Sequence, residues 1–285
     1  MNIDKLLDYL QVEQIDRYVF VGKSPKRPSR IFGGQVLAQC LNAASRTVSE
    51  DRLAHSLHAY FLRPGDPTKQ ILFEVDPIRD GGSFTTRRII AKQDGIPIFN
   101  MSASFHQEEV GFTHQMPMPE APVPETIETD EEYWERNADR LLEFMRPPSY
   151  FPVERRNVHR RDYLNPEPME PHQQFWFRVK QTLPDDLRLH QVLLAYISDY
   201  GLLGTAMYPH PISPASDSVQ AASLDHGLWF HRPFRADDYI LADMDSPSAF
   251  GNRGFSRGSF YSKDGTLIAS SVQESLLRVR PKKSD

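Results

Sequence analysis

Apolar residues recur at helical spacing in two segments of the chain. The first segment begins at the pair Gly33-Gly34, and its apolar positions are Val36, Leu37, Cys40, Leu41, Ala44 and Val48. The second follows the turn signal Leu183-Pro184-Asp185, and its apolar positions are Leu187, Val192, Leu193, Leu194, Tyr196 and Ile197. Spacing of three and four residues places these side chains on one face of a helix. We therefore predict one helix in each half of the chain.

Strand-length segments accompany each predicted helix. In the first half they span residues 57–62, 70–78, 84–93 and 96–106, separated by Pro-Gly-Asp, Asp-Gly-Gly and Asp-Gly turn signals. In the second half one strand, 174–179, precedes the helix, and the others span residues 219–230, 239–244, 254–262 and 267–277. Short strands divided by such turns favour an antiparallel meander. A helix with a hairpin-linked sheet in each half is an α+β pattern.

Two motifs of the first half return in the second. Tyr60-Phe61-Leu62-Arg63-Pro64 returns as Trp229-Phe230-His231-Arg232-Pro233, with the two prolines 169 residues apart. Gln93-Asp94-Gly95 returns as Lys263-Asp264-Gly265, with the two aspartates 170 residues apart. Two recurrences at nearly the same separation indicate a duplicated domain. Polar residues that are present in one copy and missing from the other are then the first candidates for chemistry.

The middle of the chain is rich in proline, because ten of the 23 prolines lie between Pro117 and Pro171. Proline cannot donate to a sheet ladder, so we expect an extended connector without regular sheet. Thr129 and Glu132 form a capping-box signature for one short helix there, with apolar positions Trp134, Ala138, Leu141, Leu142 and Met145 before Pro147. The predicted domains are an N-terminal repeat (1–115), this connector (116–171) and a C-terminal repeat (172–285).

Composition and charge narrow the class of protein. The net charge is −5, which disfavours a nucleic-acid partner because such proteins usually carry a strongly basic face. No apolar run approaches the ~18 residues that span a bilayer, so we expect no membrane partner. The N-terminus lacks a continuous apolar segment, and the single cysteine, Cys40, cannot form an intramolecular disulfide. Both features favour a cytoplasmic location.

Three strings of the sequence resemble the acyl-CoA thioesterase II family, and the resemblance spans most of the chain. The strings are Phe32–Val36, His55–Gly65 and Leu224–Pro233. The resemblance implies a double hotdog, in which each of two repeats wraps an antiparallel sheet around a long helix. It also implies hydrolysis of fatty acyl-CoA to free fatty acid and CoA, with acyl-CoA as the substrate partner and with no metal or redox cofactor.

The family's catalytic set is an acid, a hydroxyl residue and a glutamine from the second repeat, and its motif positions fall on Asp199, Ser223 and Gln273. Members usually carry threonine where this chain has Ser223, and serine lacks the methyl group that restricts χ1. The repeat register pairs Gln273 with Ala103, so an amide in the second copy corresponds to a methyl group in the first. In this interpretation Asp199 accepts a proton from a water molecule that the other two side chains hold.

Two other functions stay open from the residues alone. Asp225 and His226 would be essential in a hotdog hydratase or dehydratase acting on enoyl-CoA. A non-catalytic acyl-CoA-binding module would need no catalytic residue, and fold alone does not separate these functions. The pair Gly33-Gly34 is a candidate source of backbone donors for an oxyanion, and a tight helix entry explains it equally well.

Several motifs are better explained by ordinary structure. Residues 254–258 match the nucleophile-elbow pattern of serine hydrolases. That triad needs a histidine after the elbow serine in the sequence, but the last histidine of this chain, His231, precedes it. His55 and His58 would lie on opposite faces of a strand, which does not suit a metal site. Candidates for CoA phosphate contacts are Arg79, Arg88, Arg253 and Arg257. Edge strands commonly pair between subunits, so we expect a homo-oligomer, either a dimer or a tetramer.

Overall fold

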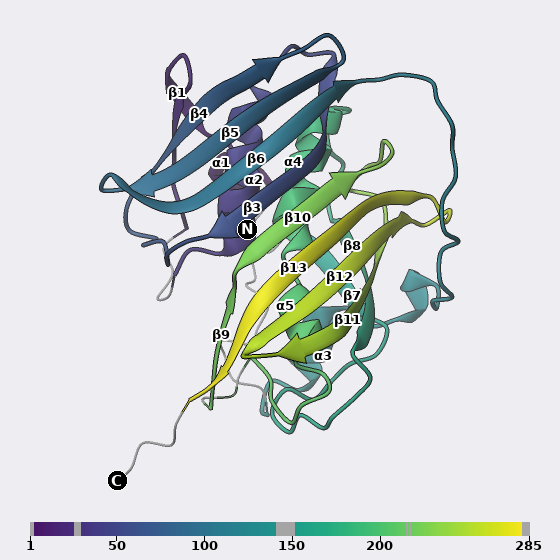
Figure 1. The fold of residues 1–285 in the computed structure, drawn as a ribbon. Helices are drawn as coiled ribbons and strands as arrows, with labels where there is room; N and C mark the ends of the chain where they lie inside the picture. The colour runs from purple at the N-terminus through teal and green to yellow at the C-terminus, as the bar shows by residue number, and fades with distance from the viewer. Residues whose placement is uncertain (1–2, 26–29, 141–151, 215, 217, 281–285) are drawn as a thin grey trace.

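The fold is dominated by one large, curved antiparallel sheet (Figure 1). The computed structural model describes residues 3–25, 30–140, 152–214, 216 and 218–280. Within this part of the chain, thirteen strands join in the order β1-β2-β4-β5-β6-β3-β10-β13-β12-β11-β8-β7, and β9 pairs with β13. The strands of the first half are β1 (Glu13–Asp16), β2 (Val19–Gly22), β3 (Arg52–Phe61), β4 (Ile71–Asp80), β5 (Phe84–Gln93) and β6 (Ile96–Gln107). Those of the second half are β7 (Val153–Asn157), β8 (His172–Val179), β9 (Val219–Ser223), β10 (Asp225–Phe230), β11 (Ile240–Phe250), β12 (Arg253–Ser262) and β13 (Leu267–Val279).

The two repeats meet in the centre of this sheet. Strands β3 and β10, which contain the recurring aromatic motif, pair antiparallel with Leu57 opposite Leu228 and Tyr60 opposite Asp225. Each of the two strands also pairs with a strand of its own repeat, β3 with β6 and β10 with β13. The strands that contain the duplicated motifs therefore lie side by side, with the two motifs at opposite ends of the pair, and the two repeat sheets become one.

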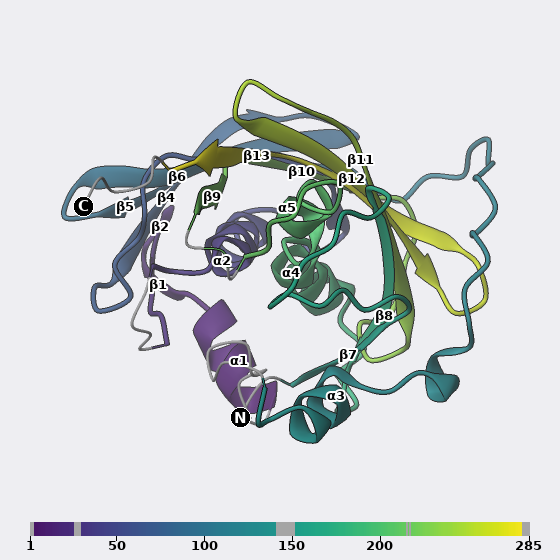
Figure 2. The ribbon, with the colours of Figure 1, turned by 90° about the horizontal axis from the view of Figure 1, so that it is seen from below.

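Two helices occupy the concave face of the sheet, where the core lies. They are α2 (Gly33–Ser45) and α4 (Leu187–Ser198), which pack against each other, and the sheet curves around them in Figure 2. The fully buried side chains between helices and sheet include Leu37 and Leu41 of α2, and Phe73, Phe99 and Phe260 of the sheet. Helix α2 contacts the strands of its own repeat, whereas α4 contacts β3 and β10 and the short helix α5 (Leu202–Thr205) covers β11–β13.

The α+β class and the predicted strands are confirmed, with differences at the boundaries. The first helix ends at Ser45, with Arg46 as its C-cap, before the predicted end at Val48. The segment predicted as one strand, 219–230, forms two strands, because its pairing with β13 shifts by one residue around Leu224. A shift of this kind is a β-bulge, which bends a strand and redirects its side chains.

Regular structure also occurs near the N-terminus, where no helix or strand is predicted from the sequence. Helix α1 (Ile3–Leu10) packs against α2 through its apolar face, and the first two strands form a hairpin whose first member is exposed throughout. No helix within the described residues is long and apolar enough to cross a bilayer. The cytoplasmic location and the homo-oligomer both stay predictions.

The expectation of no regular sheet between residues 117 and 171 is wrong. Residues Val153–Asn157 form β7, which pairs with β8 at the edge of the sheet. An edge strand needs partners on one side only, so Pro152 directly before it is tolerated. The connector also contains a 3₁₀ turn, η1 (Pro124–Thr126). The boundaries of the three predicted domains stay a prediction.

The predicted capping box of the connector helix is present. The Thr129 hydroxyl accepts a hydrogen bond from the Glu132 N–H, and the Glu132 carboxylate accepts one from the Thr129 N–H. The helix, α3 (Asp130–Arg136), ends earlier than predicted, with Asn137 as its C-cap. The other predicted apolar positions after Ala138, namely Leu141, Leu142 and Met145, lie outside the described residues, as does Pro147.

Candidate active site

Asp199 lies where the ends of the two long helices meet. It is the C-cap of α4, and its Oδ2 accepts a hydrogen bond of 2.8 Å from the Gly34 N–H at the start of α2. Helix N-termini carry partial positive charge and unpaired N–H groups, which suit a carboxylate. The second repeat therefore supplies the acid, and the first repeat supplies one of the donors that hold it.

The close approach of the helices explains the glycine pair. A Cβ on Gly33 would lie 2.8 Å from the Asp199 Oδ2, and a Cβ on Gly34 would lie 2.3 Å from the Tyr196 carbonyl oxygen. The second contact is with backbone, which cannot rotate out of the way. The Gly34 N–H, a candidate oxyanion donor in the sequence, is thus directed at the Asp199 carboxylate.

Gln273 holds the other oxygen of the same carboxylate. Its side chain on β13 is fully buried, and its Nε2 donates a hydrogen bond of 2.7 Å to the Asp199 Oδ1. Within the first repeat the corresponding position is Ala103, which is also buried and has no polar side chain. The chemistry at this position of the sheet is therefore found in one repeat only.

The surroundings of Asp199 make it more basic than an ordinary aspartate. Burial raises the pKa of its carboxyl group to about 6, while the hydrogen bonds from Gln273 and Gly34 and the charge of Arg30 act in the opposite direction. Desolvation disfavours the charged form, and donors to the carboxylate favour it. An acid with this pKa is mostly ionised at pH 7 and is still able to accept a proton during a reaction.

Ser223 lies on the same part of the sheet as Gln273 without a hydrogen bond to this pair. It is the last residue of β9, and its Cα partner on β13 is Ser275, two residues from Gln273. Side chains of paired residues and of alternate residues share one face of a sheet, so Ser223 faces the same side as Gln273 as a diagonal neighbour, roughly 7 to 8 Å away. Among the described residues, its hydroxyl forms no hydrogen bond with Asp199 or Gln273.

Asp225 and His226 are neighbours in sequence but have separate environments. The Asp225 Oδ1 accepts a hydrogen bond from the Glu274 N–H, and the side chain is partly exposed. The His226 ring is buried and contacts Gln273 and Ser198. In the described structure no hydrogen bond joins Asp225 to His226, so they do not form an acid–histidine pair.

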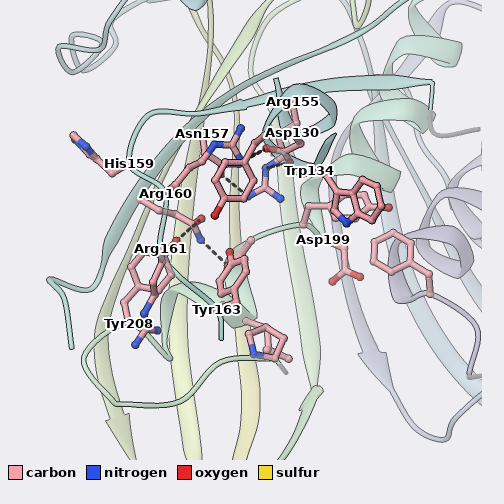
Figure 3. Close-up of a pocket in the computed structure, with 18 residues that line it drawn as sticks. Asp130, Trp134, Arg155, Asn157, His159, Arg160, Arg161, Tyr163, Asp199 and Tyr208 are labelled. Carbon is pink, nitrogen blue, oxygen red and sulfur yellow. Dashed lines mark hydrogen bonds and ion pairs between the residues drawn. The ribbon is translucent and has the colours of Figure 1, made fainter. Parts of the chain in front are cut away.

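A cavity of about 490 Å³ opens beside Asp199 (Figure 3). Asp199 lies on one side of it, across from His159, Arg160 and Arg161 of the connector. The ring and aliphatic side chains of its wall come from the connector, from residues 200–214 after α4 and from the N-cap of α2; they are Phe32, Tyr133, Trp134, Tyr163, Tyr200, Leu203, Tyr208 and Pro214. The sequence analysis missed this cavity because its walls come from segments that have no periodic pattern.

The arginines of the cavity are largely engaged by the protein. Arg160 Nη1 donates 2.7 Å to the Asp130 Oδ1, and Arg155 lies 3.8 Å from the other oxygen of that carboxylate. The Arg161 guanidinium donates to backbone carbonyls, among them those of Glu167 and His210. Their main effect is therefore to join parts of the connector to each other and to the segment after α5, which closes the cavity on one side.

Other sequence motifs have structural explanations. Residues 254–258, which match the elbow pattern, lie within strand β12. His55 Nε2 pairs with the Ser104 hydroxyl, and the described residues contain no group of three or more ligands that could hold a metal ion. Of the arginines considered for CoA phosphates, three are ion-paired on the surface; the pairs are Arg88 with Asp76, Arg253 with Glu274 and Arg257 with Asp245.

Comparison with known proteins places this chain in a family. A model of the acyl-CoA thioesterase family matches residues 145–276, and a model of the acyl-CoA thioesterase N-terminal domain matches residues 23–106. Acyl-CoA thioesterase 2 of Haemophilus influenzae is 38% identical over 97% of this chain and 98% of its own length. The chain belongs to the acyl-CoA thioesterase family. The predicted family and the predicted class of enzyme, a thioester hydrolase, are therefore confirmed.

Solved structures agree with this assignment and show the fold. The crystal structure of an acyl-CoA thioesterase II from Mycobacterium marinum matches 97% of this chain and 99% of its own, with a TM-score of 0.80 and 40% identity. A hotdog-fold protein of unknown function from Alicyclobacillus acidocaldarius matches 96% of this chain with a TM-score of 0.75 and 17% identity, which shows the fold alone. The hotdog fold of this family member is thus confirmed.

Proposed function

We propose that the protein hydrolyses fatty acyl-CoA to free fatty acid and CoA, with Asp199 as the general base. The observation that carries the proposal is the pair of hydrogen bonds that hold both oxygens of a carboxylate with a raised pKa beside a cavity. A thioester is already activated, so a positioned water and an acceptor for its proton are the main requirements. Asp199 meets the second requirement.

In the proposed reaction the water oxygen attacks the thioester carbonyl carbon while its proton passes to Asp199. The tetrahedral intermediate then collapses, the carbon–sulfur bond breaks, and the proton held by Asp199 passes to the departing CoA sulfur. Gln273 orients Asp199 through Nε2, and Ser223 faces the same side of the sheet, where its hydroxyl can bind the water. Atoms and charge balance, because water supplies the hydroxyl group of the acid and the hydrogen of the thiol.

The cavity beside Asp199 is the proposed site for the acyl group. Its ring and aliphatic side chains, including Phe32, Trp134 and Leu203, offer the apolar surface that an acyl chain requires. We expect Leu203→Trp to lower kcat/KM for long acyl chains about tenfold or more, with a smaller effect on short chains, because the larger ring fills part of the cavity. Rates of CoA release across a series of saturated acyl-CoA substrates measure this. An equal loss at every chain length would contradict the assignment.

The role of Ser223 is tested by two substitutions. We expect Ser223→Ala to lower kcat about tenfold, since the hydroxyl donor and acceptor for the water are lost. Ser223→Thr keeps the hydroxyl and fixes its χ1, so its activity is expected to equal or exceed that of the wild type. Steady-state kinetics of both variants with one acyl-CoA decide the point. Wild-type activity in the alanine variant would remove Ser223 from the catalytic set.

The two alternative functions make different demands on the same residues. A hydratase or dehydratase that uses Asp225 and His226 would need both side chains to face one bound substrate, yet they have different partners and His226 is buried. A binding module would leave acyl-CoA intact. Release of free thiol by the wild-type protein separates hydrolysis from both alternatives. A single turnover in ¹⁸O-labelled water separates attack by water from direct attack by the carboxylate. Incorporation of ¹⁸O into Asp199 would favour direct attack.

A further inference from the structure

His226 occupies a buried position directly behind Gln273. Its exposed fraction is 1%, its Nδ1 lies 3.2 Å from the Gln273 Nε2, and its Nε2 lies 3.0 Å from the Ser198 Oγ. Ser198 is the residue before Asp199, and its hydroxyl also donates 3.0 Å to the Ala195 carbonyl. A continuous chain of hydrogen bonds therefore runs from helix α4 through the ring to the glutamine and back to Asp199.

The proton inventory of this chain has one consistent solution. An ionised carboxylate only accepts hydrogen bonds, so the end of the Gln273 amide that faces Asp199 is its NH₂ group. The second hydrogen of that group can go only to an acceptor, which makes the His226 Nδ1 unprotonated. The ring proton is then on Nε2 and donates to Ser198, whose own hydrogen goes to Ala195. Burial lowers the pKa of His226 to about 3, so the ring is neutral at ordinary pH.

The first repeat has no counterpart of this arrangement. Its matching strands β3 and β6 place Leu57 opposite Ala103, and both side chains are buried and apolar. In the second repeat the pairing of Gly227 with Val272 puts His226 opposite Gln273. The glutamine and the histidine thus differ from the first repeat together.

We propose that His226 is a positioning residue that fixes the orientation of the Gln273 amide. This inference rests on the proposed function, because it concerns the moment when Asp199 takes up the proton of the water. A protonated Asp199 is a donor and could pair with the amide oxygen of a glutamine that turns over. Because the His226 Nδ1 accepts a hydrogen bond, it keeps the NH₂ group of Gln273 facing Asp199 throughout the reaction. Asp199 can then release its proton to the departing sulfur.

The test compares His226→Leu with His226→Asn. Leucine fills the space without an acceptor, so we expect kcat to fall roughly tenfold or more with little change in KM, and the acid limb of the kcat/KM profile to move to higher pH. Asparagine places its Oδ1 close to the position of Nδ1, so it is expected to restore most of kcat and the wild-type limb. Wild-type kcat and an unshifted limb in the leucine variant would overturn the inference, as would an asparagine variant as impaired as leucine.

His190→Leu is the matched control, because His190 on α4 is also a buried histidine and its Nδ1 accepts a hydrogen bond from the Ala236 N–H, away from Asp199. It is expected to lower Tm without moving the pH profile. If His226→Leu does not fold, the ring nitrogen shifts of the wild type decide by NMR: a proton on Nε2 supports the inference and a proton on Nδ1 overturns it. If Asp199→Asn loses activity while His226→Leu keeps the kcat and the acid limb of the wild type, this inference is contradicted and the proposed function stands.

Discussion

Asp199→Asn is expected to lower kcat by about 10² to 10⁴-fold, the usual contribution of a general base. The amide has nearly the same shape as the carboxylate but cannot accept the proton of the attacking water. Far-ultraviolet circular dichroism should show a folded protein, because the amide can still pair with the donors of Gly34 or Gln273. Steady-state release of CoA thiol measures the loss. Wild-type turnover by the folded variant would place the base elsewhere.

The same substitution should remove a pH dependence. Asp199 acts as a base only when it is ionised, and burial raises its pKa to about 6. As the pH falls below this value the carboxylate becomes protonated, so kcat/KM of the wild type should fall about tenfold per pH unit. As the pH rises above it, this limb should level off. The residual activity of Asp199→Asn should lack the limb.

Asp225→Asn is the matched control for this prediction. Asp225 is a second, partly exposed acid whose pKa is raised by burial, and its carboxylate accepts a hydrogen bond from the Glu274 N–H. The substitution should leave kcat within about twofold of the wild type, as substitutions outside the transition-state contacts generally do. A collapse of activity in Asp225→Asn with an active Asp199→Asn would favour the hydratase type of site.

Gln273→Ala is expected to have the second largest effect, a loss of about 10²-fold in kcat, because it removes the side-chain donor that orients Asp199. Alanine is the residue that the first repeat has at the corresponding position. The hydrogen bond from Gln273 lowers the pKa of Asp199, so its loss should raise that pKa and move the acid limb to higher pH. Full pH–rate profiles of the variant measure both changes.

Gln93→Ala provides the control for loss of a buried glutamine. Gln93 is buried at the end of β5 in the first repeat, where its amide donates to the Asp66 and Lys69 carbonyls. This variant should lower Tm while leaving kcat and the pH profile at their wild-type values. If both glutamine variants changed kcat equally, loss of stability rather than loss of a catalytic contact would explain the Gln273 result.

The elements that the sequence predicts well are those with a local physical signal. The two long helices follow from apolar spacing, and the hairpins follow from their Asp-Gly turns, where Asp94 and Gly95 adopt positive φ angles. The capping box of α3 follows from two residues, Thr129 and Glu132. Strand β7 was missed because surrounding prolines obscure it and because its pairing with β8 is a tertiary contact.

For the candidate site, sequence identifies the residues better than their contacts. Asp199 and Gln273 were expected together, and their side chains are in direct contact. The contribution of Gly34 could not be predicted, because it depends on how closely α2 approaches α4. His226 was considered only as a partner of Asp225, yet the β-bulge near Leu224 brings it opposite Gln273. Register shifts of this kind have no signal in the sequence of one chain.

Release of CoA thiol from a series of saturated acyl-CoA substrates, measured side by side for the wild type, Asp199→Asn and Asp225→Asn, tests whether Asp199 drives thioester hydrolysis. We expect the wild type and Asp225→Asn to release thiol at similar rates and the folded Asp199→Asn to be about 10² to 10⁴-fold slower. Failure of the wild type to release thiol at any chain length, or equal release by all three proteins, would contradict the proposed role of Asp199.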